Sequence, residues 1–310
     1  MKIAVIIPCF KVENHIEEVI LNLPETISYI ITVNDCSPDN TENILLALQR
    51  TNPKIVYLRN EKNLGVGGAM MSGYRKSLEL GCDITIKMDG DGQMDAKYLP
   101  ALVKPILEDR ADFVKGNRFR DYRSLKKMPV IRRFGNIGLS FFIKAASGYW
   151  NVFDPTNGFF AIRNEILKDI DLDKIHKRYF FESSQLIELY YLNAVVQDIN
   201  MAAKYGNEVS NLSITKTIFE FPPKLLRAFL KRIFLKYFLY DFNIASVYFL
   251  FGTPLLLFGS IYGGINYAEY SSSHIAAPTG TVVIPTLLII LGFQLLLSAI
   301  SYDIGNYPKK

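Results

Sequence analysis

Two carboxylates and an amide stand close together in the segment Asp89-Gly90-Asp91-Gly92-Gln93. Hard divalent cations prefer such oxygen ligands, and two carboxylates one residue apart can both reach one cation. The remaining coordination positions of that cation could then hold a diphosphate. An EF-hand calcium loop is excluded, because Met94 and Pro100 stand where that loop requires Gly and Glu. An acidic turn without a ligand is the alternative, because Asp-Gly is common in turns.

A second polar loop, residues 34–41, follows another expected strand. The carboxylate of Asp35 could accept hydrogen bonds from the edge of a uracil or guanine base. For Asp39 and Asn40 a capping role is the better interpretation, because such side chains bond the free N–H groups at the start of a helix.

A third loop, residues 63–69, opens a helix with the small-residue run Asn-Leu-Gly-Val-Gly-Gly-Ala. The run does not match the G-x-G-x-x-G fingerprint of dinucleotide-binding folds, because Met70 stands where the third Gly is required. Close approach of the backbone to a nucleotide and tight packing against another segment are both consistent with this composition.

A run of cations covers residues 115–133, with Asp121 as its one acidic residue. A solvated loop is the usual explanation for such a run. A diphosphate site nearby would instead favour phosphate binding by Arg118 and by Arg132 or Arg133. Further along, Asp154 precedes a turn and a strand. It could act as a base, orient another group, or form a structural Asx-turn.

Alternating strands and helices must position these loops. Apolar, β-branched runs predict strands over 2–7, 29–33, 54–58 and 84–88. Apolar residues at helical spacing predict helices over 13–23, 41–49 and 65–80. This order is typical of an α/β domain with a mostly parallel sheet. Ligands bind such sheets beyond the carboxyl ends of the strands, where Pro8, Asp35 and Asp89 fall.

The composition divides the chain into two parts. Of its 310 residues, 49% are hydrophobic, and the net charge is +5. Residues 244–302 nevertheless contain a single charged side chain, that of Glu269. The rest of the chain has the charge content of an ordinary soluble domain. A soluble domain joined to a membrane domain fits this division, whereas a wholly soluble protein, a many-span transporter, a disordered chain and a disulfide scaffold do not.

Cysteines, histidines and the charge distribution argue against further classes of protein. The three cysteines and three histidines lack metal-ligand spacing, which indicates reduced thiols in the cytosol and argues against a zinc site. Lys and Arg nearly balance Asp and Glu in residues 1–223, and the excess cations follow. Cations beside apolar segments favour an anionic membrane surface as partner and argue against nucleic acid.

Residues 224–240 combine an apolar face with cations, which predicts a helix in the membrane interface. A helix of a soluble core is the alternative. Residues 244–265 and 282–301 are each long enough to cross the hydrocarbon. The Lys and Arg bias places both flanks of this hairpin in the cytosol, at the cytoplasmic membrane. The cations expected at the interface are Arg227, Lys231, Arg232 and Lys236.

These predictions give four parts. A catalytic-sized cytosolic domain covers residues 1–222, an amphipathic helix 223–243, a transmembrane hairpin 244–302 and a cytosolic tail 303–310. The spans contain glycines, including Gly252 and Gly259, that could pack against other copies in a homo-oligomer.

Six segments, in chain order, resemble the motifs of family 2 glycosyltransferases of the GT-A fold, over roughly residues 1–220. They are IIPCF, VNDCSPDNT, NLGVGGAMMSG, DGDGQ, GNR and DPTNGF. The chain most resembles the branch that makes polyprenyl-phosphate sugars, the dolichyl-phosphate mannose synthases and the GtrB-type enzymes with two C-terminal spans. It departs from the family pattern at Lys11-Val12, where Asn-Glu is usual, and at Asn34 and Cys36, where Asp and Gly are usual.

The resemblance implies a GT-A, Rossmann-like sheet domain that catalyses a metal-dependent, inverting transfer of a hexose. The donor would be a nucleotide sugar, linked to UDP or to GDP. The acceptor would be a polyprenyl phosphate such as undecaprenyl phosphate. Asp89, Asp91 and Gln93 would hold Mg²⁺ or Mn²⁺, and Asp154 would orient the acceptor or act as base. A glycan acceptor and an inactive membrane scaffold are the alternatives. The expected nucleotide-sugar contacts are Pro8, Phe10, Glu13, Asp35, Asp89, Gly90, Asp91, Arg118 and Arg132.

Overall fold

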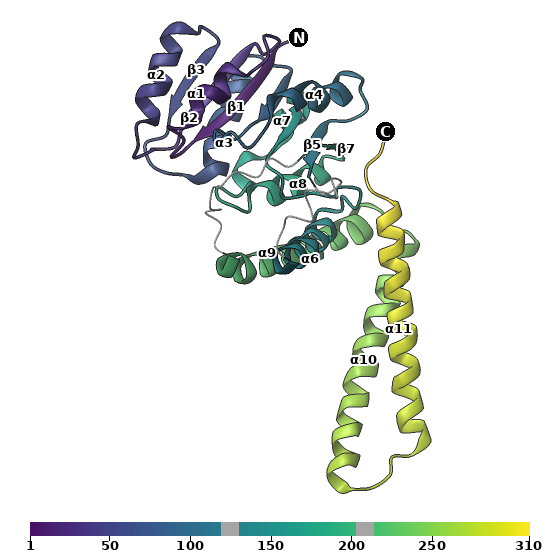
Figure 1. The fold of residues 1–310 in the computed structure, drawn as a ribbon. Coiled ribbons are helices and arrows are strands. Elements are labelled where there is room, and N and C mark those ends of the chain that lie inside the picture. The colour runs from purple at the N-terminus through teal and green to yellow at the C-terminus, as the bar shows by residue number, and fades with distance from the viewer. Residues whose placement is uncertain (119–129, 203–213) are drawn as a thin grey trace. The chain divides into compact units, whose positions relative to one another are not determined.

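The computed structural model describes residues 1–118, 130–202 and 214–310 of the chain. They form two compact units, one of residues 1–229 with 308–310 and the other of residues 230–307. The first unit contains the sheet, and the second contains the two long helices (Figure 1).

The first unit is built on a seven-stranded sheet with the order β3-β2-β1-β4-β6-β5-β7. Strand β6 runs antiparallel to both of its neighbours, and the other pairs are parallel. The predicted mostly parallel α/β sheet is therefore confirmed. The strands are β1 (Ile3–Cys9), β2 (Tyr29–Asn34), β3 (Ile55–Arg59), β4 (Ile84–Lys87), β5 (Phe113–Asn117), β6 (Phe160–Arg163) and β7 (Val196–Asn200).

Two apolar cores lie on the two faces of this sheet (Figure 1). Successive side chains of a strand point to opposite faces, so Ala4 and Ile6 join one core while Val5 and Ile7 join the other. The first core includes helices α3 (Gly65–Glu79), α6 (Val130–Ser147), α7 (Asn164–Asp169) and α8 (Phe181–Tyr191). The second includes α1 (Ile16–Leu21), α2 (Thr41–Thr51) and α4 (Leu99–Leu107).

Helix α9 (Ile214–Phe234) runs through Pro222 and Pro223, where the sequence predicts a domain boundary. Each proline lacks the N–H of a helical hydrogen bond. Burial of Phe221 and Leu225 in the first core offsets this loss, because each large apolar side chain contributes about 1.5–3 kcal/mol. The division between the compact units accordingly falls at Leu230 and not at residue 222.

The second unit holds the two predicted spans as α10 (Ile244–Ser273) and α11 (Thr279–Gly305). Both are long and apolar enough to cross a membrane, and both extend beyond the expected 244–265 and 282–301. A π-helical turn, η3 (Leu235–Tyr240), precedes them. The side chain of Asn243 caps α10 by accepting a hydrogen bond from the N–H of Ala245 at 2.9 Å.

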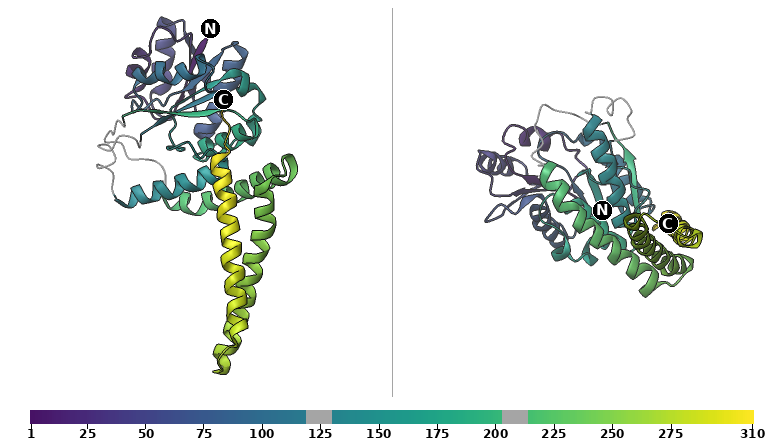
Figure 2. Two further views of the ribbon diagram at one scale, coloured as in Figure 1. Left: turned by 90° about the vertical axis from the view of Figure 1, so that its right-hand side faces the viewer. Right: turned by 90° about the horizontal axis from the view of Figure 1, so that it is seen from below.

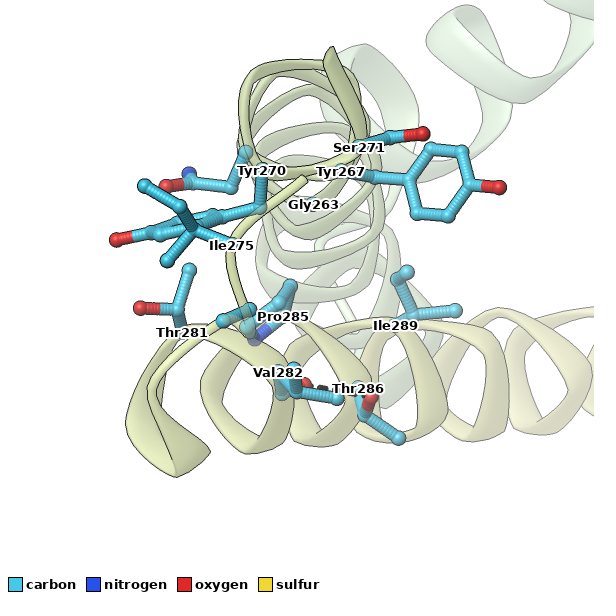
Figure 3. Close-up of a pocket in the computed structure, with 12 residues that line it drawn as sticks. Gly263, Tyr267, Tyr270, Ser271, Ile275, Thr281, Val282, Pro285, Thr286 and Ile289 are labelled. Carbon is cyan, nitrogen blue, oxygen red and sulfur yellow. Dashed lines mark hydrogen bonds between the residues drawn. The ribbon is translucent and has the colours of Figure 1, made fainter. Parts of the chain in front are cut away.

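The spans pack on each other through glycines. A Cβ on Gly292 would lie 2.5 Å from the backbone nitrogen of Leu256, and one on Gly259 would lie 2.9 Å from the Leu288 side chain. Gly252 and Gly259 thus serve contacts within the hairpin. A cavity of about 450 Å³ opens near the connection of the two helices, lined by Tyr267, Tyr270, Thr281 and Pro285 among others (Figure 3).

Candidate active site

The Asp89–Gln93 loop follows β4 at its carboxyl end, as predicted. Asp89 accepts a hydrogen bond from the ammonium of Lys87 at 2.6 Å, and Asp91 accepts one from the N–H of Gln93 at 3.0 Å. Gly92 has a φ of +76°, a conformation that side chains with a Cβ rarely adopt. The loop therefore turns back on itself and keeps both carboxylates partly exposed.

These donors fit a magnesium or manganese ion that shares its coordination with a substrate. Within the described ranges, no group of three or more His, Cys, Asp or Glu side chains could enclose a metal. Mg²⁺ is commonly bound by one or two carboxylates and completed by substrate phosphates and water. The partly exposed Asp89 and Asp91 match that donor set, and Gln93 is exposed beside them.

Asp154 and Arg118 form a forked ion pair. The guanidinium donates to the two carboxylate oxygens at 2.8 and 3.2 Å, and Asp154 is fully buried. The N–H of Arg118 donates to the same carboxylate at 3.3 Å. Such a bidentate pair fixes the plane of the guanidinium. The geometry favours the orienting role of Asp154 over that of a base, because its oxygens already accept from Arg118.

Asp35 links the end of β2 to the start of α3. It accepts hydrogen bonds from the Asn60 side chain at 2.7 Å and from the N–H groups of Leu64 and Gly65 at 2.9 and 2.8 Å. Asp35 is 3% exposed. It therefore holds the 63–69 loop in place, and its contact with a base remains a prediction.

The loop after β1 lies against the loop after β2. Glu13 accepts a hydrogen bond from the N–H of Asn40 at 2.8 Å, and Asp39 accepts one from the N–H of Glu13 at 3.3 Å. Pro8 lies within β1 opposite Val33. Phe10 is 41% exposed, which leaves its ring available for contact with a nucleoside.

The glycines of the 63–69 loop serve tight packing, one of the two open interpretations. A Cβ on Gly67 would lie 2.3 Å from the carbonyl oxygen of His176, and one on Gly65 would lie 2.8 Å from that of Lys177. The N–H of Gly68 donates to the carbonyl of Lys177 at 3.0 Å. The small residues therefore let the first turn of α3 approach another backbone segment.

Part of the predicted phosphate-binding set cannot be placed. Residues 119–129 of the basic run lie outside the described residues. Arg132 and Arg133 lie on α6, and the structure describes the helix there without their side chains. Their role in phosphate binding stays a prediction.

Three charged residues near the loop escaped the sequence reasoning: the buried Lys87 and Lys115, and the partly buried Glu182. Each lysine is 1% exposed. Lys87 is the last residue of β4, and Lys115 is the middle residue of β5. The signal that could have found the two lysines is a cationic residue within a strand whose two faces are both expected to be buried. Burial lowers the pKa of Lys115 to about 8, and burial raises the pKa of Glu182.

Asp198 on β7 makes stability depend on pH. Burial raises the pKa of its carboxyl from 3.8 to about 6, although the N–H of Phe153 donates to it. When the pKa of an acid is higher in the folded state, the acid stabilises the fold at pH values below its unfolded-state pKa. That stabilisation is lost as the pH rises through the folded-state pKa. The melting temperature of the wild type should therefore fall relative to that of Asp198→Asn as pH rises from 3.8 to about 6. If the melting temperatures of the two proteins, measured in detergent, changed equally with pH over this range, the raised pKa of Asp198 would be contradicted.

Apolar side chains on α6 and beside Asp154 form an exposed surface, which we call the aromatic patch. It consists of Ile137, Phe141, Phe142 and Phe153, which are 50–60% exposed. Helix α6 and the first part of α9 lie on the same side of the sheet (Figures 1 and 2). An apolar surface of this kind marks contact with a membrane or a partner.

The predicted interface cations divide into two pairs. Arg227 and Lys231 are exposed. Arg232 is 1% exposed and donates to both oxygens of Asp303 at 2.8 and 2.7 Å, and Lys236 donates to Asp303 at 3.2 Å. Arg232 is therefore withdrawn from lipid headgroups, because the π-helical turn and α11 bring a carboxylate to it. The prediction for Arg232 was wrong, and that for Lys236 stays a prediction.

A solved structure shares the fold. The glucosyl-3-phosphoglycerate synthase of Mycobacterium tuberculosis, crystallised with Mn²⁺, UDP and phosphoglyceric acid, aligns with a TM-score of 0.54 at 18% identity. The alignment covers 74% of this chain and 78% of the synthase. The sheet domain therefore has the GT-A fold of that structure.

Sequence comparisons supply the family. The model of Glycosyl transferase family 2 matches residues 4–171, and the chain belongs to that family. It is 34% identical to a UDP-N-acetylglucosamine–dolichyl-phosphate N-acetylglucosaminyltransferase of Methanococcus voltae, over 60% of this chain and 78% of the relative. It is 32% identical to an undecaprenyl-phosphate mannosyltransferase of Micrococcus luteus, over 57% of this chain and 73% of the relative. The resemblance read from the motifs is thereby confirmed.

Proposed function

We propose that this enzyme transfers a hexose from a nucleotide sugar to a polyprenyl phosphate. The observation that carries the proposal is the joining, in one chain, of a family 2 glycosyltransferase domain to two helices apolar enough to cross a membrane. The names of the relatives, a dolichyl-phosphate and an undecaprenyl-phosphate transferase, support this class of acceptor.

The acceptor chemistry suits the site. A phosphate monoester has a second pKa near 6, so its oxygen is already anionic near pH 7. Attack of that oxygen on the anomeric carbon forms the new bond as the bond to the donor diphosphate breaks, which inverts the centre. The reaction then requires positioning and charge stabilisation more than proton removal. This agrees with an Asp154 carboxylate that holds Arg118 and is not free to act as base.

The charges of the site have separate roles in this proposal. Asp91, with Asp89 and Gln93, would hold the divalent cation, which supplies stabilisation of the departing nucleotide diphosphate. Arg118, with its plane fixed by Asp154, would donate to a phosphate. Phe10 and Asp35 would contact the nucleoside. A UDP-sugar is the favoured donor, with a GDP-sugar as the alternative.

The membrane assignment completes the proposal. We place both flanks of the hairpin in the cytosol, so that a soluble donor meets a lipid-borne acceptor at the cytoplasmic leaflet. The exposed Arg227 and Lys231 would face anionic headgroups. The aromatic patch would enter the interface beside the acceptor, since aromatic side chains favour the headgroup level.

The patch gives a prediction on membrane binding. Phe141→Ser/Phe142→Ser should reduce vesicle-dependent activity about tenfold or more, because each exposed ring would lose apolar contact with lipid. Activity on a short-chain, water-soluble isoprenyl phosphate should change little. Leu21→Ser is the control, since Leu21 is 70% exposed on α1 and outside the patch. Equal losses of activity on the vesicle-borne and the water-soluble acceptor would show that the aromatic patch does not act at the membrane interface.

The proposed function is tested with the full chain in vesicles. UDP- and GDP-hexoses are supplied with undecaprenyl phosphate, with and without EDTA, and lipid-linked sugar is separated by chromatography. Metal-dependent formation of a lipid-phosphate sugar is expected. If sugar were transferred to a glycan acceptor and not to undecaprenyl phosphate, the proposal would be wrong and the enzyme would be a glycan glycosyltransferase. No turnover with any donor, in folded protein, would favour an inactive scaffold.

A further inference from the structure

A buried ammonium stands behind the Asp89–Gln93 loop. The Nζ of Lys87, at the end of β4, lies 2.6 Å from Oδ1 of Asp89 and 3.8 Å from Oε1 of Glu182. Glu182 comes from the first turn of α8, far from β4 in the sequence. One cation thus lies between a carboxylate of the loop and a carboxylate of the core.

The backbone at Gly158 closes this cluster. A Cβ there would lie 2.4 Å from Nζ of Lys87, 3.2 Å from Oδ2 of Asp89 and 3.4 Å from Oε1 of Glu182. A side chain at this position would collide with the Lys87 ammonium and crowd the Asp89 carboxylate. On strand β5, which pairs with β6, the buried Lys115 donates to the carbonyl of Asn157. The turn that carries Asp154 is therefore clamped between two buried lysines.

This arrangement leaves Asp89 with a fixed orientation. Its Oδ1 is held by Lys87, and its Oδ2 lies beside Gly158. Without the ammonium, the Asp89 carboxylate would be repelled by Glu182 and Asp91 and would turn toward solvent. A group that orients a ligand in advance spares the ordering cost at the moment of binding.

We propose that Lys87, held from behind by Glu182, is a positioning residue that fixes the Asp89 carboxylate for the cation and nucleotide diphosphate of the donor. The inference rests on the donor site of the proposed function. The competing explanation is structural: Lys87 would only neutralise Glu182 inside the core, and Asp89 would be a secondary partner.

A double variant separates the two explanations. Lys87→Met alone removes the nearer of the two lysine charges that act on the partly buried Glu182, so the melting temperature of this variant should fall. Lys87→Met/Glu182→Gln removes both charges and should recover most of that loss. If Lys87 positions Asp89, the double variant should still bind Mn²⁺ with UDP about 10–100-fold more weakly than wild type, as removal of a ligand's supporting partner typically does. Binding equal to wild type in the recovered double variant would overturn the proposal.

Two further variants keep the test decisive. Lys87→Gln/Glu182→Gln restores a neutral donor and should bind Mn²⁺ and UDP more tightly than the methionine variant if the hydrogen bond to Asp89 matters. Equal affinities of the two double variants for Mn²⁺ and UDP would count against positioning. Lys97→Met is the matched control, because this exposed lysine pairs with Asp95 at 2.7 Å near the loop. The affinity of the Lys97→Met variant for Mn²⁺ and UDP should equal that of the wild type.

The readouts are the melting temperature, Mn²⁺ affinity by electron paramagnetic resonance and nucleotide affinity by calorimetry, with GDP in parallel with UDP. None of them depends on the lipid acceptor. A wild type that binds Mn²⁺ and a nucleotide but transfers no sugar to a polyprenyl phosphate would defeat the proposed function alone. A recovered double variant that binds as wild type does would defeat the positioning role alone.

Discussion

Replacing Asp91 by Asn is expected to abolish sugar transfer while leaving the fold intact. The side chain of Asp91 is partly exposed and accepts a hydrogen bond from the N–H of Gln93, which an Asn oxygen can also accept. The change therefore removes a charge and little packing. Loss of one group that stabilises developing charge typically costs about 10²–10³-fold in rate, and loss of a cation ligand should cost at least as much.

Asp95→Asn is the control for this prediction. Asp95 lies four residues on, and its side chain accepts a hydrogen bond from the N–H of Lys97 at 3.0 Å, which Asn can replace. Transfer rates, Mn²⁺ affinity and melting temperature should be measured for both variants. An Asp91→Asn enzyme with wild-type rates would remove Asp91 from the cation site.

The second large effect is expected at the buried ion pair of the hairpin unit. Asp303 accepts from Arg232 at 2.8 and 2.7 Å and from the hydroxyl of Tyr237 at 2.6 Å. Asp303→Ala would leave the guanidinium buried and unpaired, which typically costs about 3–5 kcal/mol. We expect a large fall in the melting temperature of the full chain in detergent, together with a lower yield of inserted protein.

A compensated variant identifies the cause of that loss. Arg232→Met/Asp303→Leu removes both charges and should be more stable than Asp303→Ala, because an apolar pair of similar volume avoids the buried unpaired charge. Glu269→Gln is the control, as Glu269 is an exposed acid of the same unit. If Asp303→Ala melted like Glu269→Gln, the pair would contribute nothing to stability.

Local patterns were sufficient to predict the sheet domain. Apolar runs at residues 29–33 and 84–88 indicated buried strands, and the loops after them placed Asp35 and Asp89 at the carboxyl ends. Those signals depend on neighbours in the sequence, so one chain is enough to detect them. The family resemblance rested on the same loops and was confirmed.

The parts that escaped prediction depend on distant partners. Arg232 had the spacing of an interface cation, and nothing local shows that Asp303, 71 residues away, pairs with it. Glu182 likewise meets Lys87 only because α8 packs beside β4 and the Gly158 turn. The first compact unit also extends past residue 222, because burial of Phe221 supports a helix that runs through two prolines.

The strand order bears on how the active site forms during synthesis. Strand β6 lies between β4 and β5 and pairs antiparallel with both. A nascent chain that ends before β6 can form the β1–β4 sheet, but β5 has no direct partner there. The turn directly before β6 meets Arg118 through Asp154 and the Asp89 carboxylate at Gly158, so these contacts form only when this part of the chain is made. A ribosome-bound chain that ends before β6 should hence be unable to assemble the candidate site.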